Sequence, residues 1–324
     1  MADEVAADIG GTMPETAAPR RRWRLGLWAL PVLLVLALGY WVGGAFWVHT
    51  IDADPSFTQD LQVPAGASHA VEATAALVSR EVDTHRWTAN DPWFQPGFLL
   101  DNMPNFQQGI LAAASRFTVE LTDQLARIRG ASQVDPDADA AAGRLKYPGD
   151  VWFLEWSRTP VQPSSESQYR RAVEDLRRFN QRLAAGQATF DRRADNLIAT
   201  LDRIAADTGG SSAAIAQKVD DTANRWFDFD ADNLFYNNKG RIYGYFIILR
   251  ALGQDFEQVL RERNAMPNWN ELLRTLEAAS SLHPWVVING APDSVMRPNH
   301  LAAQGFFLLR ARFQLYQVID ILTK

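Results

Sequence analysis

An uncharged apolar stretch near the start of the chain restricts what the rest can fold into more than any other feature. Residues 25–48 read LGLWALPVLLVLALGYWVGGAFWV, 24 residues without a charged side chain. At about 1.5 Å per residue a helix of this length reaches roughly 36 Å, more than the hydrocarbon core of a bilayer, which is about 30 Å thick. The stretch predicts a transmembrane helix over residues 25–48, with the lipid bilayer as its partner.

Charged residues flank this stretch unequally. Four arginines precede it, and one histidine and two aspartates follow it: Arg20, Arg21, Arg22, Arg24, His49, Asp52 and Asp54. Loops rich in Lys and Arg stay on the cytoplasmic side of a membrane. We therefore expect residues 1–24 in the cytoplasm and residues 49–324 beyond the membrane.

The alternative to a retained helix is a cleaved signal peptide. Such peptides have an apolar core of about 7–15 residues and end in small residues. This stretch is longer and ends in Phe46, Trp47 and Val48. Aromatic residues near both of its ends are typical of an interfacial belt: Trp23, Trp28, Tyr40, Trp41 and Trp47. These features favour a retained membrane helix.

Composition limits the class of the remaining chain. The 324 residues carry a net charge of −6, and because residues 1–24 are neutral, this charge belongs to the part beyond the stretch. A mildly acidic chain is not typical of nucleic-acid binding. The absence of cysteine excludes disulfides, thiolate metal sites and a Cys nucleophile. We expect no cofactor and no nucleic-acid partner.

The apolar pattern predicts an all-α protein in four segments. Residues 1–24 are expected to form a disordered tail, 25–48 the membrane helix, 49–66 a linker and 67–324 a helical domain. About eight helices are predicted in this domain: 68–85, 105–129, 165–186, 190–209, 212–224, 231–263, 268–279 and 299–322. The helix over 231–263 is apolar on most sides in its middle, which predicts the central position in a bundle.

Local signals refine this expectation. Ser68, Asn105 and Asn299 are predicted N-caps, and Ser165 and Asn268 begin predicted capping boxes. Helices 165–186 and 190–209 are joined closely enough to predict an antiparallel hairpin that ends at Gly209 and Gly210. Gly240 and Gly244 lie four residues apart and predict the close approach of a neighbouring helix. Residues 131–146 are polar and alanine-rich, which favours loose order.

Three irregular segments, 87–104, 147–163 and 283–298, combine prolines with aromatic residues. Residues 151–156 in the second permit a short strand. Polar residues recur in and beside these segments: Asp101, Asn102, Asn233, Tyr236, Arg241, Asn289, Asn299 and His300. The simpler interpretation is that they cap helices and hold turns. The functional interpretation is that the three segments meet at one end of the bundle, where these residues line a ligand-binding cleft.

No sequence motif indicates a particular reaction. The chain lacks a His-Glu-x-x-His zinc helix, a phosphate-binding glycine loop and a Gly-x-Ser-x-Gly elbow. Irregular segments contain carboxylates that could act as a hydrolase pair: Asp150, Glu155, Asp228, Asp230 and Asp232. A metal site formed by His283, Asp293 and His300 has no supporting ligand spacing.

A basic face is expected on the helices between residues 165 and 209. It contains Arg170, Arg171, Arg177, Arg178, Arg182, Arg192 and Arg193, beside Glu166, Glu174, Asp175 and Asp191. The simpler interpretation is a solvated face on which these charges balance. The alternative is a surface for anionic lipid headgroups or cell-wall polymer.

Several segments together resemble a bacterial family grouped as domain of unknown function 2333. They are PGFLLDNMPNFQQGIL (96–111), PSSESQY (163–169), RADNL (193–197), DNLFYNNKGR (232–241), and ING with PNHLAAQGFFLLRARFQLYQVIDIL near the C-terminus. The resemblance extends from the apolar stretch to the C-terminus and implies a single-pass inner-membrane protein of Gram-negative bacteria with a helical periplasmic body. Its matched positions coincide with the polar residues Asp101, Asn102, Asn233, Tyr236, Asn289, Asn299 and His300. It implies no catalytic role. The longer N-terminus and the alanine-rich 131–146 segment depart from the family pattern.

Together these features predict a membrane-anchored periplasmic scaffold or interaction protein of the bacterial cell envelope, with envelope proteins as partners. Two alternatives come from other classes. One is an envelope hydrolase acting on peptidoglycan, and the other is a periplasmic sensor of a small ligand.

Overall fold

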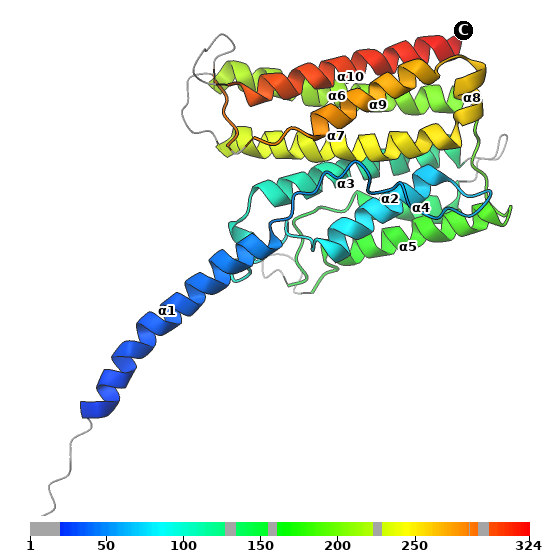
Figure 1. The fold of residues 1–324 in the computed structure, drawn as a ribbon. Helices are drawn as coiled ribbons and strands as arrows, with labels where there is room; N and C mark the ends of the chain where they lie inside the picture. The colour runs from blue at the N-terminus through cyan, green and yellow to red at the C-terminus, as the bar shows by residue number, and fades with distance from the viewer. Residues whose placement is uncertain (1–19, 127–133, 155–160, 223–228, 285, 291–297) are drawn as a thin grey trace, which may run out of the picture.

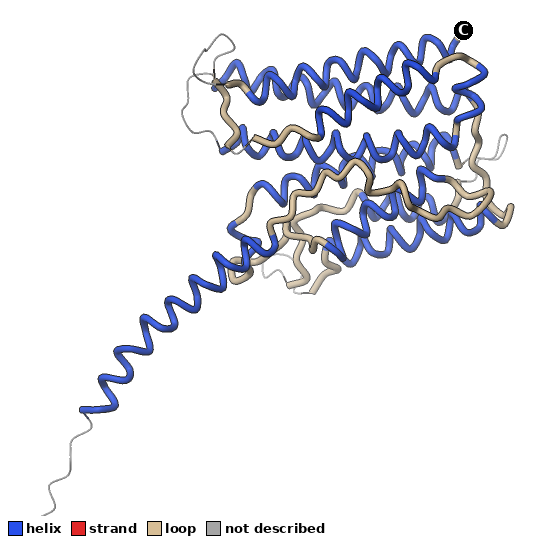
Figure 2. The backbone as a smooth tube through the Cα atoms, in the orientation of Figure 1, coloured by secondary structure: helices blue, strands red, loops and turns tan. Residues whose placement is uncertain are grey.

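The computed structural model describes residues 20–126, 134–154, 161–222, 229–284, 286–290 and 298–324. Within these ranges the chain is helical, and the only β-type pairing is an isolated bridge between Asn289 and Asn299 (Figure 2). The helices are α1 (Arg20–Val48), α2 (His69–Ser79), α3 (Asn102–Glu120), α4 (Pro136–Leu145), α5 (Ser165–Ala184), α6 (Ala194–Thr222), α7 (Phe229–Asp255), α8 (Glu257–Glu262), α9 (Met266–Ser280) and α10 (His300–Thr323). The all-α prediction is confirmed, with nine described helices after the first rather than about eight.

Helix α1 projects from the body as a rod (Figure 1). Its segment Trp28–Val48 has a mean hydropathy of 1.9 and is long and apolar enough to cross a membrane. The last turns of α1 pack against a 3₁₀ turn, Pro96–Leu99, where a Cβ on Gly44 would overlap the ring of Pro96. The predicted N-terminal apolar helix is confirmed, and its end is attached to the body by this contact.

Helix α7 is the centre of the body. It packs against α2 and α3 on one side and against α9 on the other, while α10 packs on α6 and α9 (Figure 1). The side chains of residues 245–249 and of Ile242 and Tyr243 are all buried. A helix that is apolar on every side must be covered on every side. The predicted central position is therefore confirmed, although the helix ends at Asp255 and α8 is separate.

Helices α3 and α7 cross at very short range because glycines line the contact. A Cβ on Gly109 would collide with the carbonyl oxygen of Asn237, and one on Gly240 with the carbonyl oxygen of Phe106. A Cβ on Gly244 would lie 2.8 Å from the Cβ of Ala113. The close approach predicted from Gly240 and Gly244 is confirmed.

The predicted hairpin of two helices is wrong. Helix α5 packs against α2 and α4, whereas α6 packs mainly against α10. Gly209 and Gly210 do not end a helix, because α6 continues to Thr222 and includes the predicted 212–224 helix. Each glycine costs a helix about 1 kcal/mol relative to alanine. Tertiary packing compensates at Gly209, since a Cβ there would press on the guanidinium of Arg312 in α10 at 3.0 Å.

The expectation of loose order is wrong for residues 136–145, which form α4. Asp135 caps this helix, its side chain accepting from the amides of Asp137 and Ala138 at 3.0 and 3.3 Å, and Pro136 occupies the first turn. The buried residues of α4 are mostly alanines, namely Ala138, Ala141 and Ala142 with Leu145. Small apolar residues gave too weak a periodic signal to predict this helix.

Several predicted helix starts shift by a few residues. Ser68 and Asn299 are N-caps as predicted, but α3 is capped by Asp101 instead of Asn105 and α5 by Ser164 instead of Ser165. Helix α9 starts at Met266, before the box predicted at Asn268. The strand permitted at 151–156 is absent from residues 151–154, and 155–156 lie outside the described residues.

Candidate functional site

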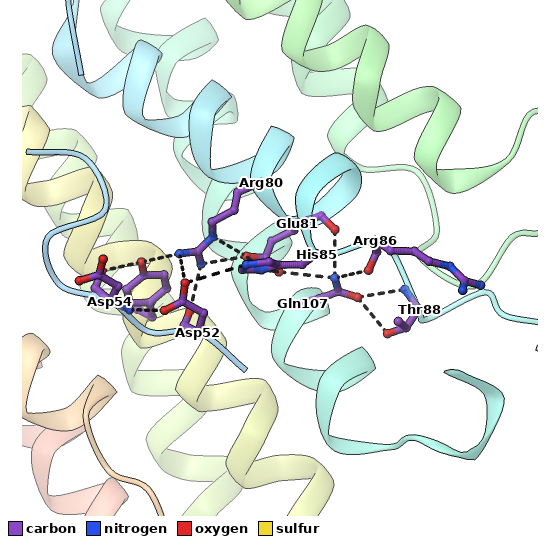
Figure 3. A network of polar contacts seen from close by, with 9 residues as sticks. Asp52, Asp54, Arg80, Glu81, His85, Arg86, Thr88 and Gln107 are labelled. Carbon is purple, nitrogen blue, oxygen red and sulfur yellow. Dashed lines mark hydrogen bonds and ion pairs between the residues drawn. The ribbon is translucent and has the colours of Figure 1, made fainter. Parts of the chain in front are cut away.

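The segment that follows α1 is fastened to the body by a buried arginine. Arg80 opens a π-helical turn after α2, and its side chain is 5% exposed. It donates to the carbonyl oxygen of Asp52 at 3.0 Å and to the hydroxyl of Tyr243 in α7 at 2.9 Å (Figure 3). That hydroxyl donates in turn to the carbonyl oxygen of Asp54 at 2.8 Å. Burial raises the pKa of Tyr243 to about 12, so its hydroxyl remains a donor at neutral pH.

The same network continues into the first irregular segment. Glu81 accepts from Arg80 Nε at 2.9 Å and lies 3.4 Å from His85 Nδ1 (Figure 3). Gln107 of α3 donates to the carbonyl oxygens of Glu81 and Arg86 and accepts two bonds from Thr88, all at 2.8–3.0 Å. Each of these groups is bonded to at least one other, an arrangement that fixes the segment after α1 and the turn after α2 against α3 and α7. We call these residues the junction network, and their role is structural.

Four of the eight predicted site residues gather where α3 and α7 begin. Asn105 donates to Asn233 at 2.9 Å, and the side chain of Asn102 hydrogen-bonds to Asp232. Burial and the nearby charge of Asp101 raise the pKa of Asp232 to about 6. Burial and the same two carboxylates raise the pKa of Tyr236. We call Asp101, Asn102, Asp232, Asn233 and Tyr236 the carboxyl cluster.

Two histidines lie near this cluster. His49 follows α1 directly. Burial lowers its pKa, the nearby charge of Asp101 opposes this shift in part, and His283 adds to it. The carboxyl cluster is therefore placed at the end of the body from which α1 emerges. Two carboxyl groups with different environments are the usual arrangement for acid and base roles. Among the described residues no group of three potential ligands could hold a metal ion.

Arg241 is not part of the carboxyl cluster. It donates to both carboxylate oxygens of Asp207 in α6 at 3.0 Å, and Tyr245 donates to the same carboxylate at 2.6 Å. At about 100° per residue, a sequence separation of nine places Asp232 and Arg241 on opposite faces of α7. Arg241 instead lines a cavity of about 330 Å³, together with Arg116, Arg203 and Ser211.

Asn289, Asn299 and His300 form a separate group at the start of α10. Asn299 caps the helix, accepting from the amide of Ala302 at 2.7 Å, and pairs with Asn289 in the isolated bridge. His300 Nδ1 accepts from the amide of Ile288 at 3.0 Å. These bonds agree with the simpler interpretation, in which the polar residues cap helices and hold turns. Each of the three side chains hydrogen-bonds to a backbone atom.

The first and second irregular segments contact each other. Trp87 Nε1 donates to the carbonyl oxygen of Gly149 at 2.7 Å, and the rings of Phe94 and Trp152 lie 5.6 Å apart. The third segment begins near His49, but its residues 291–297, including Asp293, lie outside the described residues. Glu155 and Asp228 also lie outside them. Of the predicted carboxylates, Asp232 has a carboxyl neighbour, Asp101, from another helix.

The basic face is largely neutralised, as the simpler interpretation predicted. Arg170 pairs with Asp83 at 2.7 Å and Arg182 with Asp135 at 2.7 Å. Arg178 contacts Asp175 and also pairs with Asp137 at 3.3 Å. Most partners come from neighbouring elements rather than from the acids of the same helix.

Two exposed apolar surfaces were missed by sequence reasoning. The first, the aromatic rim, lies on the first two irregular segments and comprises Trp93, Phe94, Phe98, Leu99 and Phe153, each 40–69% exposed. The second, the α10 stripe, comprises Phe306, Leu309, Phe313 and Tyr316, each 40–63% exposed. The spacing of three, four and three residues was visible in the sequence, but no exposed apolar face was predicted for this helix.

Comparison with known proteins identifies a family and no activity. The sequence profile of the family DUF2333, described as an uncharacterized protein conserved in bacteria, matches residues 21–225 and 213–324. Neither a curated protein nor a solved structure matches the chain. Because the two matched segments together cover nearly the whole sequence, the chain belongs to the bacterial family DUF2333.

Proposed function

We propose that this protein is a single-pass inner-membrane scaffold whose helical body binds an envelope protein on the periplasmic side. The length and hydropathy of α1 support a membrane span, and the arginines before it support a cytoplasmic N-terminus. The junction network supports a body held at a fixed orientation to that span. A scaffold needs such a fixed orientation in order to present a binding surface away from the membrane.

The α10 stripe is the observation on which the binding role rests. Its residues recur at alternating steps of three and four, the spacing of an apolar seam that pairs with another helix. Fully burying a side chain of this kind stabilises a complex by about 1.5–3 kcal/mol. Exposed apolar side chains gathered on one face are typical of interaction sites. Helix α10, which carries the stripe, lies on the opposite side of the body from α1 (Figure 1).

Charges beside the stripe favour an acidic partner. Arg310 and Arg274 share one carboxylate, Glu271, at 2.5 and 2.7 Å, and Arg312 lies over the ring of Tyr316 at 5.7 Å. Three arginines thus border the stripe beside one glutamate. A second copy of α10 would bring arginines against arginines. We therefore expect an amphipathic helix with acidic residues beside its own apolar seam.

Site-specific photocrosslinking tests the binding role. A photoreactive residue replacing Phe313, at native expression, is expected to cross-link one envelope protein through an acidic amphipathic helix. The same residue replacing Arg171, exposed on α5, serves as the control and is expected to give no such product. Absence of a product at Phe313, or cross-linking only to a second copy of the chain, would contradict the proposal.

Topology has a separate test. A phosphatase fused after Lys324 is active only outside the cytoplasm, so activity is expected in intact cells. An inactive fusion, or a mature chain that lacks residues 25–48 and fractionates as soluble protein, would contradict the membrane-anchored arrangement.

The carboxyl cluster favours a hydrolase as the second candidate function. Burial and the nearby charge of Asp101 raise the pKa of Asp232 to about 6, the direction in which glycosidases shift a general acid. Incubation of the chain with purified peptidoglycan tests this function. Release of product that is abolished by Asp232→Asn and retained by Asp230→Asn would favour the enzyme over the scaffold.

A further inference from the structure

A cavity of about 380 Å³ lies between α1 and the first two irregular segments. Its wall combines three aromatic rings, Tyr40, Phe94 and Trp152, with one arginine, Arg86, and two carboxylates, Asp91 and Glu166. Such a combination differs from an apolar docking groove, because both signs of charge and several ring faces meet in one space.

The charged groups of the cavity are held in place. Arg86 donates to both carboxylate oxygens of Asp91, at 2.8 and 3.0 Å, and the Asp91 side chain is 4% exposed. Arg86 itself has a φ of 61°, a left-handed conformation that is uncommon for a residue with a side chain. Asn90 donates to Glu166 at 2.8 Å and fixes the second carboxylate. The site is therefore built before any ligand arrives.

The formal charge of the cavity favours a ligand that carries a positively charged group at one end. Arg86 balances one of the two carboxylates, which leaves a single negative charge facing three aromatic rings. Ammonium groups bind the faces of aromatic rings and pair with carboxylates. An anion alone would be repelled, whereas a zwitterion could place its ammonium near Glu166 and its phosphate towards Arg86.

The position of the cavity indicates where such a zwitterion comes from. Tyr40 belongs to α1 and lies in the outer of its two aromatic belts, which sit at the level of lipid headgroups. The aromatic rim shares Phe94 with the wall of the cavity. Trp152, also in that wall, joins the rings of the rim into a row, in which Trp93, Phe94, Trp152 and Phe153 follow one another at centroid distances of 5.7, 5.6 and 4.4 Å. This apolar surface is continuous with that of α1.

We infer that the cavity binds the headgroup of a zwitterionic phospholipid, of the ethanolamine type, in the leaflet that meets the body. The ammonium pairs with Glu166 and the rings of Phe94 and Trp152, and the phosphate faces Arg86. The aromatic rim lies in the same leaflet around it. The location of the site rests on the proposed membrane span, but its chemistry does not.

Binding of short-chain lipids to the full chain in maltoside detergent tests the site. Native mass spectrometry is used to compare dihexanoyl phosphatidylethanolamine with dihexanoyl phosphatidylglycerol, which has the same chains and a net negative charge. We expect phosphatidylethanolamine to bind about tenfold more tightly, the effect of one charge-assisted contact. Equal binding of the two lipids, or tighter binding of phosphatidylglycerol, would overturn the inference.

Three variants locate the effect. Glu166→Gln keeps the shape but removes the charge, and is expected to abolish most of the preference. Phe94→Leu keeps an apolar side chain without a ring and is expected to weaken phosphatidylethanolamine binding several-fold. Glu174→Gln, exposed on the same helix, is the matched control and should change neither value. A preference that survives Glu166→Gln would also overturn the site.

The outcome can be separated from that of the proposed function. Alkaline extraction of membranes reports whether the chain is integral, independently of headgroup preference. An integral chain without lipid preference would leave the membrane span standing and remove the headgroup site. A chain that is extracted at alkaline pH but still prefers phosphatidylethanolamine would remove the membrane span and leave the headgroup site standing.

Discussion

The aromatic rim and the α10 stripe expose the same kinds of side chain in different structural settings. The rim is formed by irregular backbone and lies against the last turns of α1, with Pro96 touching Gly44. The stripe lies on a regular helix that contacts α6 and α9 and is remote from α1 (Figure 1). Lipid requires no matching periodicity, whereas a protein helix does. Exposure alone therefore does not identify a partner; backbone regularity and neighbouring elements distinguish lipid from protein.

The largest expected effect concerns the junction network, because the comparison requires the rim to stay at a fixed position relative to α1. Arg80→Ala leaves Glu81, which is 1% exposed, without its arginine. Removing one member of a buried ion pair costs about 3–5 kcal/mol. Chemical denaturation of the full chain in detergent should show a loss of this size. Arg261→Ala, at an arginine that is 69% exposed and paired within its own helix, should change stability by less than about 0.5 kcal/mol. A loss below about 1 kcal/mol at Arg80 would mean that the network does not hold the rim.

A charge placed on the stripe should separate the two surfaces. Phe313→Asp puts a carboxylate into the apolar seam and should reduce partner binding by at least about tenfold, from the loss of one buried aromatic contact. Phe98→Asp makes the same change on the rim and should leave partner binding unaltered. Both side chains are more than half exposed, so neither change should alter folding stability by more than about 0.5 kcal/mol. Co-purification of the cross-linked partner provides the measurement, and equal loss in both variants would abolish the distinction.

The fold could be predicted from the sequence where the residues of a single helix determine its position. The middle of α7 is apolar on every side, so its central position follows from its own residues. The α3–α7 crossing is marked by Gly240 and Gly244 in the same way. Helix partners were not predictable, because the choice between α5 and α10 as the neighbour of α6 depends on surfaces far apart in the chain. Helix α4 was missed because alanines bury little apolar surface.

The candidate site was predictable only in part, for a related reason. Four of the predicted residues lie just before or in the first turns of helices: Asp101, Asn102, Asn233 and Tyr236. They come together because α3 and α7 begin at the same end of the body. The separation of Arg241 from Asp232 follows from helical phase and could have been derived from the sequence. The approach of Asp101 to Asp232 depends on the α3–α7 crossing, and so does the raised pKa of Asp232. The stripe was overlooked because one helix carries two apolar faces, and sequence alone does not show which one is covered.

The carboxyl cluster should give the α1 end of the body a pH dependence that the stripe lacks. The folded-state pKa of Asp232, about 6, lies above its ordinary value of 3.8, so the folded protein binds this proton more tightly than the unfolded chain. The free energy of unfolding should therefore fall as the pH rises from about 4 to about 6, and stay lower above that window. Asp232→Asn should recover about 1–2 kcal/mol at pH 8 and almost nothing at pH 4, since the half-buried site reduces the full value of about 3 kcal/mol.

The control for this pH dependence is Asp230→Asn, whose side chain is 81% exposed. It should change stability little at either pH. Denaturation curves of the three proteins at pH 4, 6 and 8 provide the measurement. A gain from Asp232→Asn that is the same at all three values would indicate a packing effect instead of a titration.

The smallest expected effect tests the comparison most directly. A fluorescent label reports the surroundings of each surface without removing a contact. The chain contains no cysteine, so a single introduced thiol can be labelled specifically. A fluorophore at Leu99→Cys on the rim should be quenched by bromine atoms on the acyl chains of the host bilayer, since the proposed membrane span would place the rim, which lies beside α1, at the interface. The same fluorophore at Leu309→Cys on the stripe should not be quenched. The two side chains are 60% and 55% exposed, so their access to label is similar and the difference reports position. Equal quenching at both sites would place α10 at the membrane as well and would remove the reason for assigning it a protein partner.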